Sequence, residues 1–269
     1  MEFSQNLKDN ITYLHKKLNV ETNFDVVYRV VHIGGREACL YFIDGFTKDE
    51  SLLKILQVFS TIKPEDMPKD AHGFSKQYVP YGEIGLLSND QDMTVQLLSG
   101  VSCLFIDGYD KCITIDCRTY PSRGVSEPEK DKVMRGSRDG FVETLIFNTA
   151  LIRRRIRDPR LTMEITSAGE SSHTDIAICY MENRVDKQLL DKIKKRIQNL
   201  KVDALTMNQE SLAECIYPHK WYNPFPKFRF SNQRKTPQWQ TGLYPNNLRG
   251  HIKFDMPSLY YPSKIFLKL

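Results

Sequence analysis

Two hydrophobic periodicities alternate along the first 217 residues, and this alternation restricts the possible folds more than any other feature of the sequence. Apolar residues spaced three and four apart predict amphipathic helices. Short apolar runs bounded by glycine-containing turns predict strands. Helices and strands that alternate in this way pack as layers of an α/β protein. We therefore predict an α/β fold, arranged as two small α/β subdomains with mixed sheets joined by a linker.

The first subdomain is predicted to span residues 1–119. Ser4 is the predicted cap of an opening helix, and Thr47 and Ser88 each begin a capping-box pattern that predicts a further helix. The stretch 63–80 carries three prolines and is predicted to be irregular. The predicted strands are 26–31, 38–43, 101–107 and 112–117.

The second subdomain is predicted to span residues 135–217. Before it, the charged stretch 120–134 contains two prolines and is the candidate linker. After it, the stretch 218–269 begins with an aromatic, proline-rich segment and then loses periodicity, so we predict a divergent, irregular tail. The predicted helices of this half are 140–157, 186–199 and 208–216, and the predicted strands are 161–166 and 175–180.

Composition bounds the function only loosely. The net charge of +5, from 38 basic and 33 acidic residues, is small for a dedicated nucleic-acid binder and equally compatible with a nearby anionic membrane surface. The six cysteines lack the paired spacing of a zinc site, and no nucleotide-binding or hydrolase motif occurs. We therefore predict no metal, no cofactor and no enzymatic activity. The N-terminus lacks the apolar run of a signal peptide, and no stretch of about 18 apolar residues predicts a membrane span.

The densest group of charged residues surrounds a predicted helix start. Arg135, Arg138, Asp139 and Glu143 lie among two glycines, at a position where arginines can hold a carboxylate or phosphate in a bidentate manner. Alternatively, the two arginines form ion pairs that fix the linker against the second subdomain. These four residues are candidates for a ligand site or for a subdomain interface.

A second basic group lies at the end of the helix predicted over 140–157. Arg153, Arg154 and Arg157 lie mostly opposite Ile152 and Ile156 on a helical wheel, and cations also complement a helix C-terminus. This placement predicts a solvated face or salt bridges between subunits rather than contacts with nucleic acid. The three arginines are the subunit-interface candidates.

Several ordered motifs then point to a known family. They include an R-x-V-x-E-P motif followed by R-G-S-R-D-G-F-V-E, an N-x-x-L-I-R-R-R-I helix that begins at Asn148, and an N-P-F-P-K element. Together with two earlier segments that end in Asp-Gly, they span roughly residues 25 to 230, and in this respect the chain resembles the GerA-type spore germination proteins. The motif segments are 41–45, 98–108, 123–143, 148–156 and 223–227.

The resemblance implies more than the residues themselves do. It implies the soluble N-terminal region of a germinant receptor A subunit, which ends before the transmembrane domain of the family and leaves 218–269 as a pre-membrane tail. It places the full-length relatives in the spore inner membrane with B and C subunits, responding to amino acids, sugars or nucleosides. It also adds Asn148 to the ligand or subdomain-interface candidates. The leading hypothesis is a receptor module, and the alternative is a pure assembly module that self-associates or binds partners but no small molecule.

Overall fold

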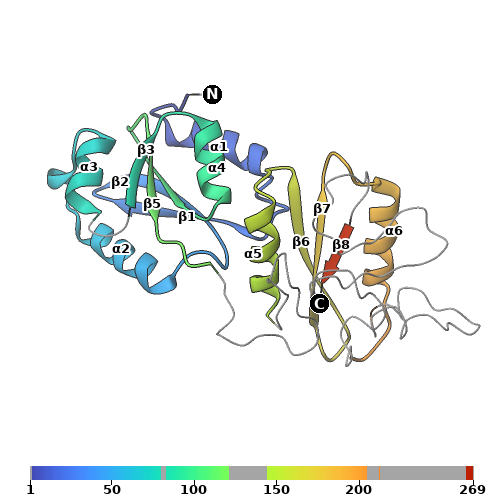
Figure 1. The fold of residues 1–269 in the computed structure, drawn as a ribbon. Helices are drawn as coiled ribbons and strands as arrows, with labels where there is room; N and C mark the ends of the chain where they lie inside the picture. Colours follow the sequence, from blue (N-terminus) through green and yellow to red (C-terminus); the bar gives the residue numbers. More distant parts are fainter. Residues whose placement is uncertain (1, 80–82, 121–143, 205–211, 213–264, 269) are drawn as a thin grey trace, which may run out of the picture. The chain divides into compact units, whose positions relative to one another are not determined.

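The computed structural model of the chain describes residues 2–79, 83–120, 144–204, 212 and 265–268. The chain divides into two compact units. Unit 1 comprises Met1–Pro121 and Thr149–Pro159, and unit 2 comprises Ser122–Asn148 and Arg160–Leu269. Figure 1 labels the elements, which are α1 (Leu7–Leu18), β1 (Val26–Ile33), β2 (Arg36–Ile43), α2 (Asp49–Thr61), a 3-10 turn (Pro64–Asp66), α3 (Ala71–Tyr78), β3 (Glu83–Leu87), α4 (Asp90–Leu98), β4 (Ser102–Ile106), β5 (Cys112–Asp116), α5 (Leu145–Arg155), β6 (Leu161–Ala168), β7 (Thr174–Met181), α6 (Lys187–Gln198) and β8 (Ile265–Lys268).

The sheet of unit 1 has five strands in the order β1-β2-β4-β5-β3. All of its strand pairs are antiparallel among the described residues, and the same holds for the β6-β7-β8 sheet of unit 2. The α/β class is therefore confirmed, whereas the expectation of mixed sheets is wrong. Three of these pairs, β1-β2, β4-β5 and β6-β7, join consecutive strands as hairpins, and a tight turn can join only antiparallel neighbours. The pairs β2-β4, β3-β5 and β7-β8 join strands far apart in the sequence, and their direction has no local signal. Gly34 and Gly35, with φ of 54° and 77°, provide the turn between β1 and β2.

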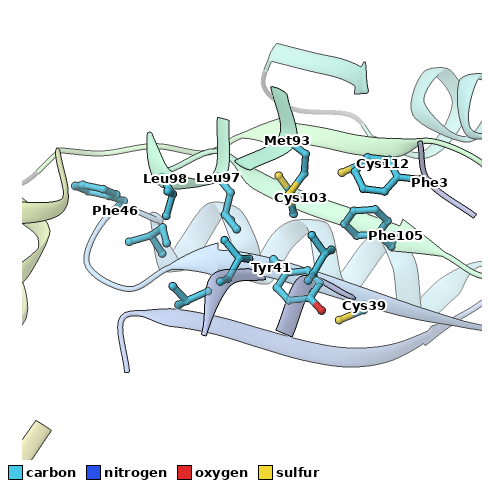
Figure 2. Packing of buried hydrophobic residues seen from close by; sticks show 14 of the residues in the cluster. Phe3, Cys39, Tyr41, Phe46, Met93, Leu97, Leu98, Cys103, Phe105 and Cys112 are labelled. Carbon is cyan, nitrogen blue, oxygen red and sulfur yellow. The ribbon is translucent and has the colours of Figure 1, made fainter. Parts of the chain in front are cut away.

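Helices cover both faces of the five-stranded sheet. Along β2, Cys39, Tyr41 and Ile43 face a core built with α1 and α4, while Ala38 and Leu40 face a second core built with α2 and α3. Figure 2 shows the first of these cores, in which Tyr41 lies among apolar side chains of neighbouring strands and helices. Because both faces of β2 are buried, this strand is a nearly continuous apolar run rather than an alternating one.

The helix starts in unit 1 use different caps from those predicted. Asn6, not Ser4, caps α1, and its side chain accepts a hydrogen bond from the backbone of Lys8. Asn89, not Ser88, caps α4 through a 2.8 Å bond from the Asp92 N–H. The capping-box expectation at residue 47 is wrong, because Lys48 occupies the N-cap of α2 and makes no side-chain cap bond. In each case the helix begins one or two residues later than the sequence pattern suggests.

Two elements of unit 1 were missed by the sequence patterns. The stretch 63–80, predicted to be irregular, contains helix α3, which Asp70 caps through a 2.8 Å bond from the Gly73 N–H. Strand β3 is the edge strand beside β5, and it carries a glycine in its centre. Both elements are short, so neither gives enough periodicity to be recognised from a single sequence.

Gly100 lies where α4 turns into β4, and its backbone has a φ of 100°. A side-chain carbon at this position would lie 2.9 Å from the buried ring of Phe46. Both the left-handed backbone and the close approach of Phe46 therefore require glycine here. Gly108 has a similar φ of 86°, but a carbon there would meet only the end of the Arg36 side chain, at 3.1 Å.

Helix α5 divides between the two units. The sequence placed the whole of this helix in the second subdomain, but residues from Thr149 to Pro159 cluster with unit 1. Ala150 joins the core shared by α1 and α4, which gives a physical reason for this placement. Three predicted segments lie almost entirely outside the described residues. The structure describes only Tyr120 of the predicted linker, only Leu212 of the helix predicted at 208–216, and only β8 of the tail. The predicted subdomain boundaries stay predictions.

In the described part of unit 2, helix α6 packs against the sheet. Helix α6 is amphipathic and buries Leu189, Leu190, Ile193 and Ile197 in a core with the strand β7. Asp186 caps the helix by accepting bonds from the N–H groups of its first turn. The predicted helix at 186–199 and the strands at 161–166 and 175–180 are thus confirmed, with the two strands longer than predicted.

Candidate functional site: the buried arginine of helix α5

A buried ion pair joins α5 to the start of β1 within unit 1. The Arg153 guanidinium donates from Nε to Asp25 Oδ2 at 2.7 Å and from Nη2 to Asp25 Oδ1 at 3.0 Å. A third bond runs from Arg153 Nη1 to the carbonyl oxygen of Asp158 at 3.3 Å. The side chains of Arg153 and Asp25 are 0% and 2% exposed. This bidentate geometry is the strongest form of an arginine–carboxylate contact, and it fixes both partners in orientation.

The burial of Arg153 corrects the sequence analysis, which placed it on a solvated face. Residues four apart share a face of a helix, so Arg153 shares a face with Thr149, which is itself buried. The buried face of α5 is therefore centred between Ile152 and Arg153 rather than on Ile152. Asp25 was not predicted as a functional residue. The available signal in the sequence was limited to a carboxylate directly before an apolar strand.

The neighbouring Arg154 is exposed and stacks on an aromatic ring. Its guanidinium carbon lies 4.5 Å from the centroid of the Tyr120 ring. The Tyr120 hydroxyl donates to the Ser99 carbonyl oxygen at 2.9 Å, and the ring packs edge-on against Phe46. Tyr120 is thus held in place by the body of unit 1, and it offers Arg154 a fixed platform for a cation–π contact.

A second ion pair between an arginine and a carboxylate lies beside the Tyr120 ring. Arg118 and Asp116 contact each other at 2.5 Å, and Arg118 also donates to the Ser99 hydroxyl at 3.1 Å. Burial raises the pKa of the Asp116 carboxyl, but the hydrogen bonds from Arg118 outweigh this effect and lower the pKa below its ordinary value. Asp116 therefore stays ionised and keeps Arg118 oriented toward Tyr120.

One carboxyl near the buried pair behaves differently. The Asp44 N–H donates to the carbonyl oxygen of Asp25 at 2.9 Å, which places the two residues side by side. Burial raises the pKa of the Asp44 carboxyl, and the charges of Asp25 and Asp49 add to this effect, while the Gly45 N–H opposes it. The end of β2 is therefore an acidic corner of unit 1, close to the carboxylate that binds the α5 arginine.

The remaining predicted site residues divide into three groups. Arg135, Arg138, Asp139 and Glu143 lie outside the described residues. Asn148 is fully buried on α5, with 0% exposure. Arg157 is exposed, like Arg154, and donates from Nε to the carbonyl oxygen of Arg154 at 3.4 Å. The roles of these residues in ligand binding or assembly stay predictions.

The cysteines of the described part are buried and chemically quiet. Cys39, Cys103, Cys112, Cys117 and Cys179 are all free thiols. Burial raises the pKa of Cys39 to about 11, which disfavours the reactive thiolate at neutral pH. Across the described ranges, no three His, Cys, Asp or Glu side chains are grouped in a way that could hold a metal ion. The helices of this part are also too short or too polar to cross a membrane.

Comparison with known proteins assigns the chain to a class. Residues 12–235 match the family described as Bacillus/Clostridium GerA spore germination protein. Stage V sporulation protein AF of Bacillus subtilis (strain 168) is 34% identical over 231 residues, which cover 85% of this chain and 46% of that protein. Spore germination protein B1 of the same strain is 27% identical over 232 residues, which cover 84% of this chain and 46% of that protein. The chain thus spans a little under half the length of these relatives.

A solved structure has the same fold. The N-terminal domain of the A subunit of the Bacillus megaterium spore germinant receptor GerK3 superimposes with a TM-score of 0.60 and 22% identity, over 84% of this chain and 83% of that one. The fold is therefore that of the N-terminal domain of this germinant receptor A subunit. The chain belongs to the GerA family of spore germination proteins, and the resemblance inferred from its motifs is confirmed.

Proposed function

We propose that the chain is a non-enzymatic receptor module that acts in spore germination, where it takes part in germinant sensing and in subunit assembly. The observation that carries the proposal is its fold, shared with the N-terminal domain of the A subunit of a germinant receptor over 84% of the chain. The proposed partners are the B and C subunits of such a receptor, at the spore inner membrane. The proposed ligand is a small polar germinant such as an amino acid, a sugar or a nucleoside.

Thermal unfolding of the chain in the presence of candidate germinants tests the sensing part of this proposal. A ligand that binds only the folded state stabilises it by mass action, by about 2.7 kcal/mol at a concentration 100 times the dissociation constant. We expect a saturable rise of the unfolding midpoint with one class of amino acids, sugars or nucleosides. A folded chain whose midpoint does not change with any of them would contradict sensing by this region.

The alternative is a pure assembly module that binds no small molecule. Two exposed arginines favour it, Arg154 on α5 and Arg157 just after the helix, because the buried pair of Arg153 holds the backbone here while their charged ends remain at the surface. Replacement of both Arg154 and Arg157 by glutamate should reduce self-association or binding to partner subunits, measured as mass in sedimentation. The matched control is a replacement of the exposed Lys8 and Lys16 on α1 by glutamate. An equal effect of both pairs, or no effect of either, would contradict an interface on α5.

A further inference from the structure

Helix α6 is strongly basic for its length. Its twelve residues, Lys187–Gln198, include five basic residues and one acidic residue, which gives a net charge of +4. The 269 residues together have a net charge of +5, from 38 basic and 33 acidic residues. The helix is therefore much more basic per residue than the sequence as a whole, and its charge lies within about 18 Å.

The packing of α6 directs most of this charge outward. The helix, which is orange in Figure 1, lies along one face of the β6-β7-β8 sheet and buries its apolar residues there. Lys194 is the exception, because it contacts Glu164 at 2.6 Å at the edge of this interface. The other basic side chains of α6 are exposed, and Lys201 adds one more just after the helix.

Two acidic residues, Glu182 and Asp191, lie among the exposed lysines of α6. Lys187 is 75% exposed and pairs with Glu182 at 3.3 Å, a surface contact of little energetic weight. Asp191 is the single acidic residue within the helix. Lys192 and Lys195 lie three apart on the outward face, one turn from each other. They form the centre of a basic face, which we define as Lys187, Lys192, Lys195, Arg196 and Lys201.

We propose that this basic face of α6 binds the anionic headgroups of a lipid bilayer. Four of its five residues are lysines, which act as compact point charges toward phosphate and need no shaped pocket. Helix α6 presents no aromatic side chain on which a nucleic acid base could stack, which favours lipid over single-stranded nucleic acid. Its apolar face is already buried, so binding rests on charge alone and the helix lies on the surface without insertion. Clusters of four to eight lysines and arginines on an amphipathic helix are typical of such binding.

Co-sedimentation of the complete chain with lipid vesicles tests this proposal. One set of vesicles is phosphatidylcholine alone, and the other contains about one-third phosphatidylglycerol. Each basic residue near an anionic surface strengthens binding by about fivefold, so replacing both Lys192 and Lys195 by glutamine should weaken partition to the anionic vesicles by about 25-fold. Binding of the unchanged chain should also decline as salt shortens the range of electrostatic attraction from about 10 Å at 0.1 M to about 3 Å at 1 M.

The matched control replaces Lys8 and Lys16 on α1, which are also exposed, by glutamine. It removes the same charge from the chain but leaves the basic face of α6 intact, and should leave partition nearly unchanged. Equal losses in the two double variants would overturn the proposal, and so would equal binding of the unchanged chain to both kinds of vesicle. Tighter binding to duplex DNA or RNA than to anionic vesicles, lost in the α6 variant, would assign the face to nucleic acid and overturn the lipid assignment. None of these outcomes depends on germinant binding.

Discussion

Replacement of Arg153 by methionine is the sharpest test of how unit 1 holds helix α5. Methionine retains much of the length and volume of the arginine stem but cannot donate to a carboxylate. The replacement removes both bonds to Asp25, at 2.7 and 3.0 Å, and the bond to the Asp158 carbonyl. Asp25, whose side chain is only 2% exposed, is left without its cationic partner.

The expected magnitude follows from this burial. Removing one partner of a buried ion pair costs about 3–5 kcal/mol, because the remaining charge is desolvated and uncompensated. Since a domain of this size is stable by about 5–15 kcal/mol, the variant should lose about a fifth or more of its stability. For a unit of roughly 130 residues, the unfolding midpoint should fall by about 10–20 °C. Lysine at the same position should cost less, because it keeps the charge while losing the bidentate contact.

Urea unfolding followed by far-ultraviolet circular dichroism measures these changes. Arg154, the neighbouring and exposed arginine, provides the control: its replacement by methionine removes only a cation–π contact with Tyr120 and should cost about 0.5–1 kcal/mol. The double replacement of Asp25 by leucine and Arg153 by methionine should be much less harmful than the sum of the two single changes. Additive losses, or an Arg153→Met cost no greater than that of Arg154→Met, would refute the reasoning.

Three further predictions concern unit 1. Asp90 is buried, which raises its pKa, but bonds from Lys17 and a neighbouring tyrosine outweigh burial and lower the pKa below its ordinary value. Asp90→Asn should therefore destabilise the chain above about pH 5, and the difference should shrink as acid titrates the carboxylate below its unfolded pKa of about 3.9, measured by urea unfolding across pH. Gly100→Ala should cost about 1–3 kcal/mol more than Gly108→Ala, since both positions have positive φ but only the first meets a buried ring, as thermal unfolding of the two variants will measure. Lys48→Ser should raise stability by about 0.5–1 kcal/mol, because it gives α2 the side-chain cap it lacks; an unchanged urea midpoint would contradict this.

Much of the fold could be predicted because many helices and strands carry a clear pattern of apolar residues and turn residues in their own sequence. Strands β1 and β2 flank a pair of glycines, and helix α6 has a clear apolar stripe, so both were recognised from their own residues. Strand pairing is a different kind of information, since it depends on contacts between distant segments. The antiparallel pairing of β2 with β4, 60 residues later in the chain, has no local signature, and the expectation of mixed sheets failed for this reason.

The candidate site was harder to predict than the fold, and Arg153 shows why. A helical wheel shows which residues share a face, and the buried face is then inferred from hydrophobicity. By this rule any arginine is assigned to the solvent face. That rule fails when a buried carboxylate pairs with the arginine, because the pair is neutral as a whole and can be buried. Asp25 lies 128 residues earlier in the chain, so no spacing within the helix reveals it. Only the tertiary structure brings the two residues together.

The contacts of Arg153 and Arg154 also bear on how the proposed roles in sensing and assembly can be separated by experiment. Tyr120 comes just before the stretch 121–143, which holds four of the candidate residues, and Arg154 follows that stretch and contacts the Tyr120 ring at 4.5 Å. The chain therefore leaves unit 1 and returns to it at nearly the same place, and the buried pair of Arg153 fixes the point of return. Because the pair acts on the position of α5 rather than on any ligand, the Arg153→Met variant should weaken sensing and assembly together. The double replacement of Arg154 and Arg157 should instead weaken assembly alone. If this double replacement weakened germinant binding and assembly equally, the two proposed functions would share one surface.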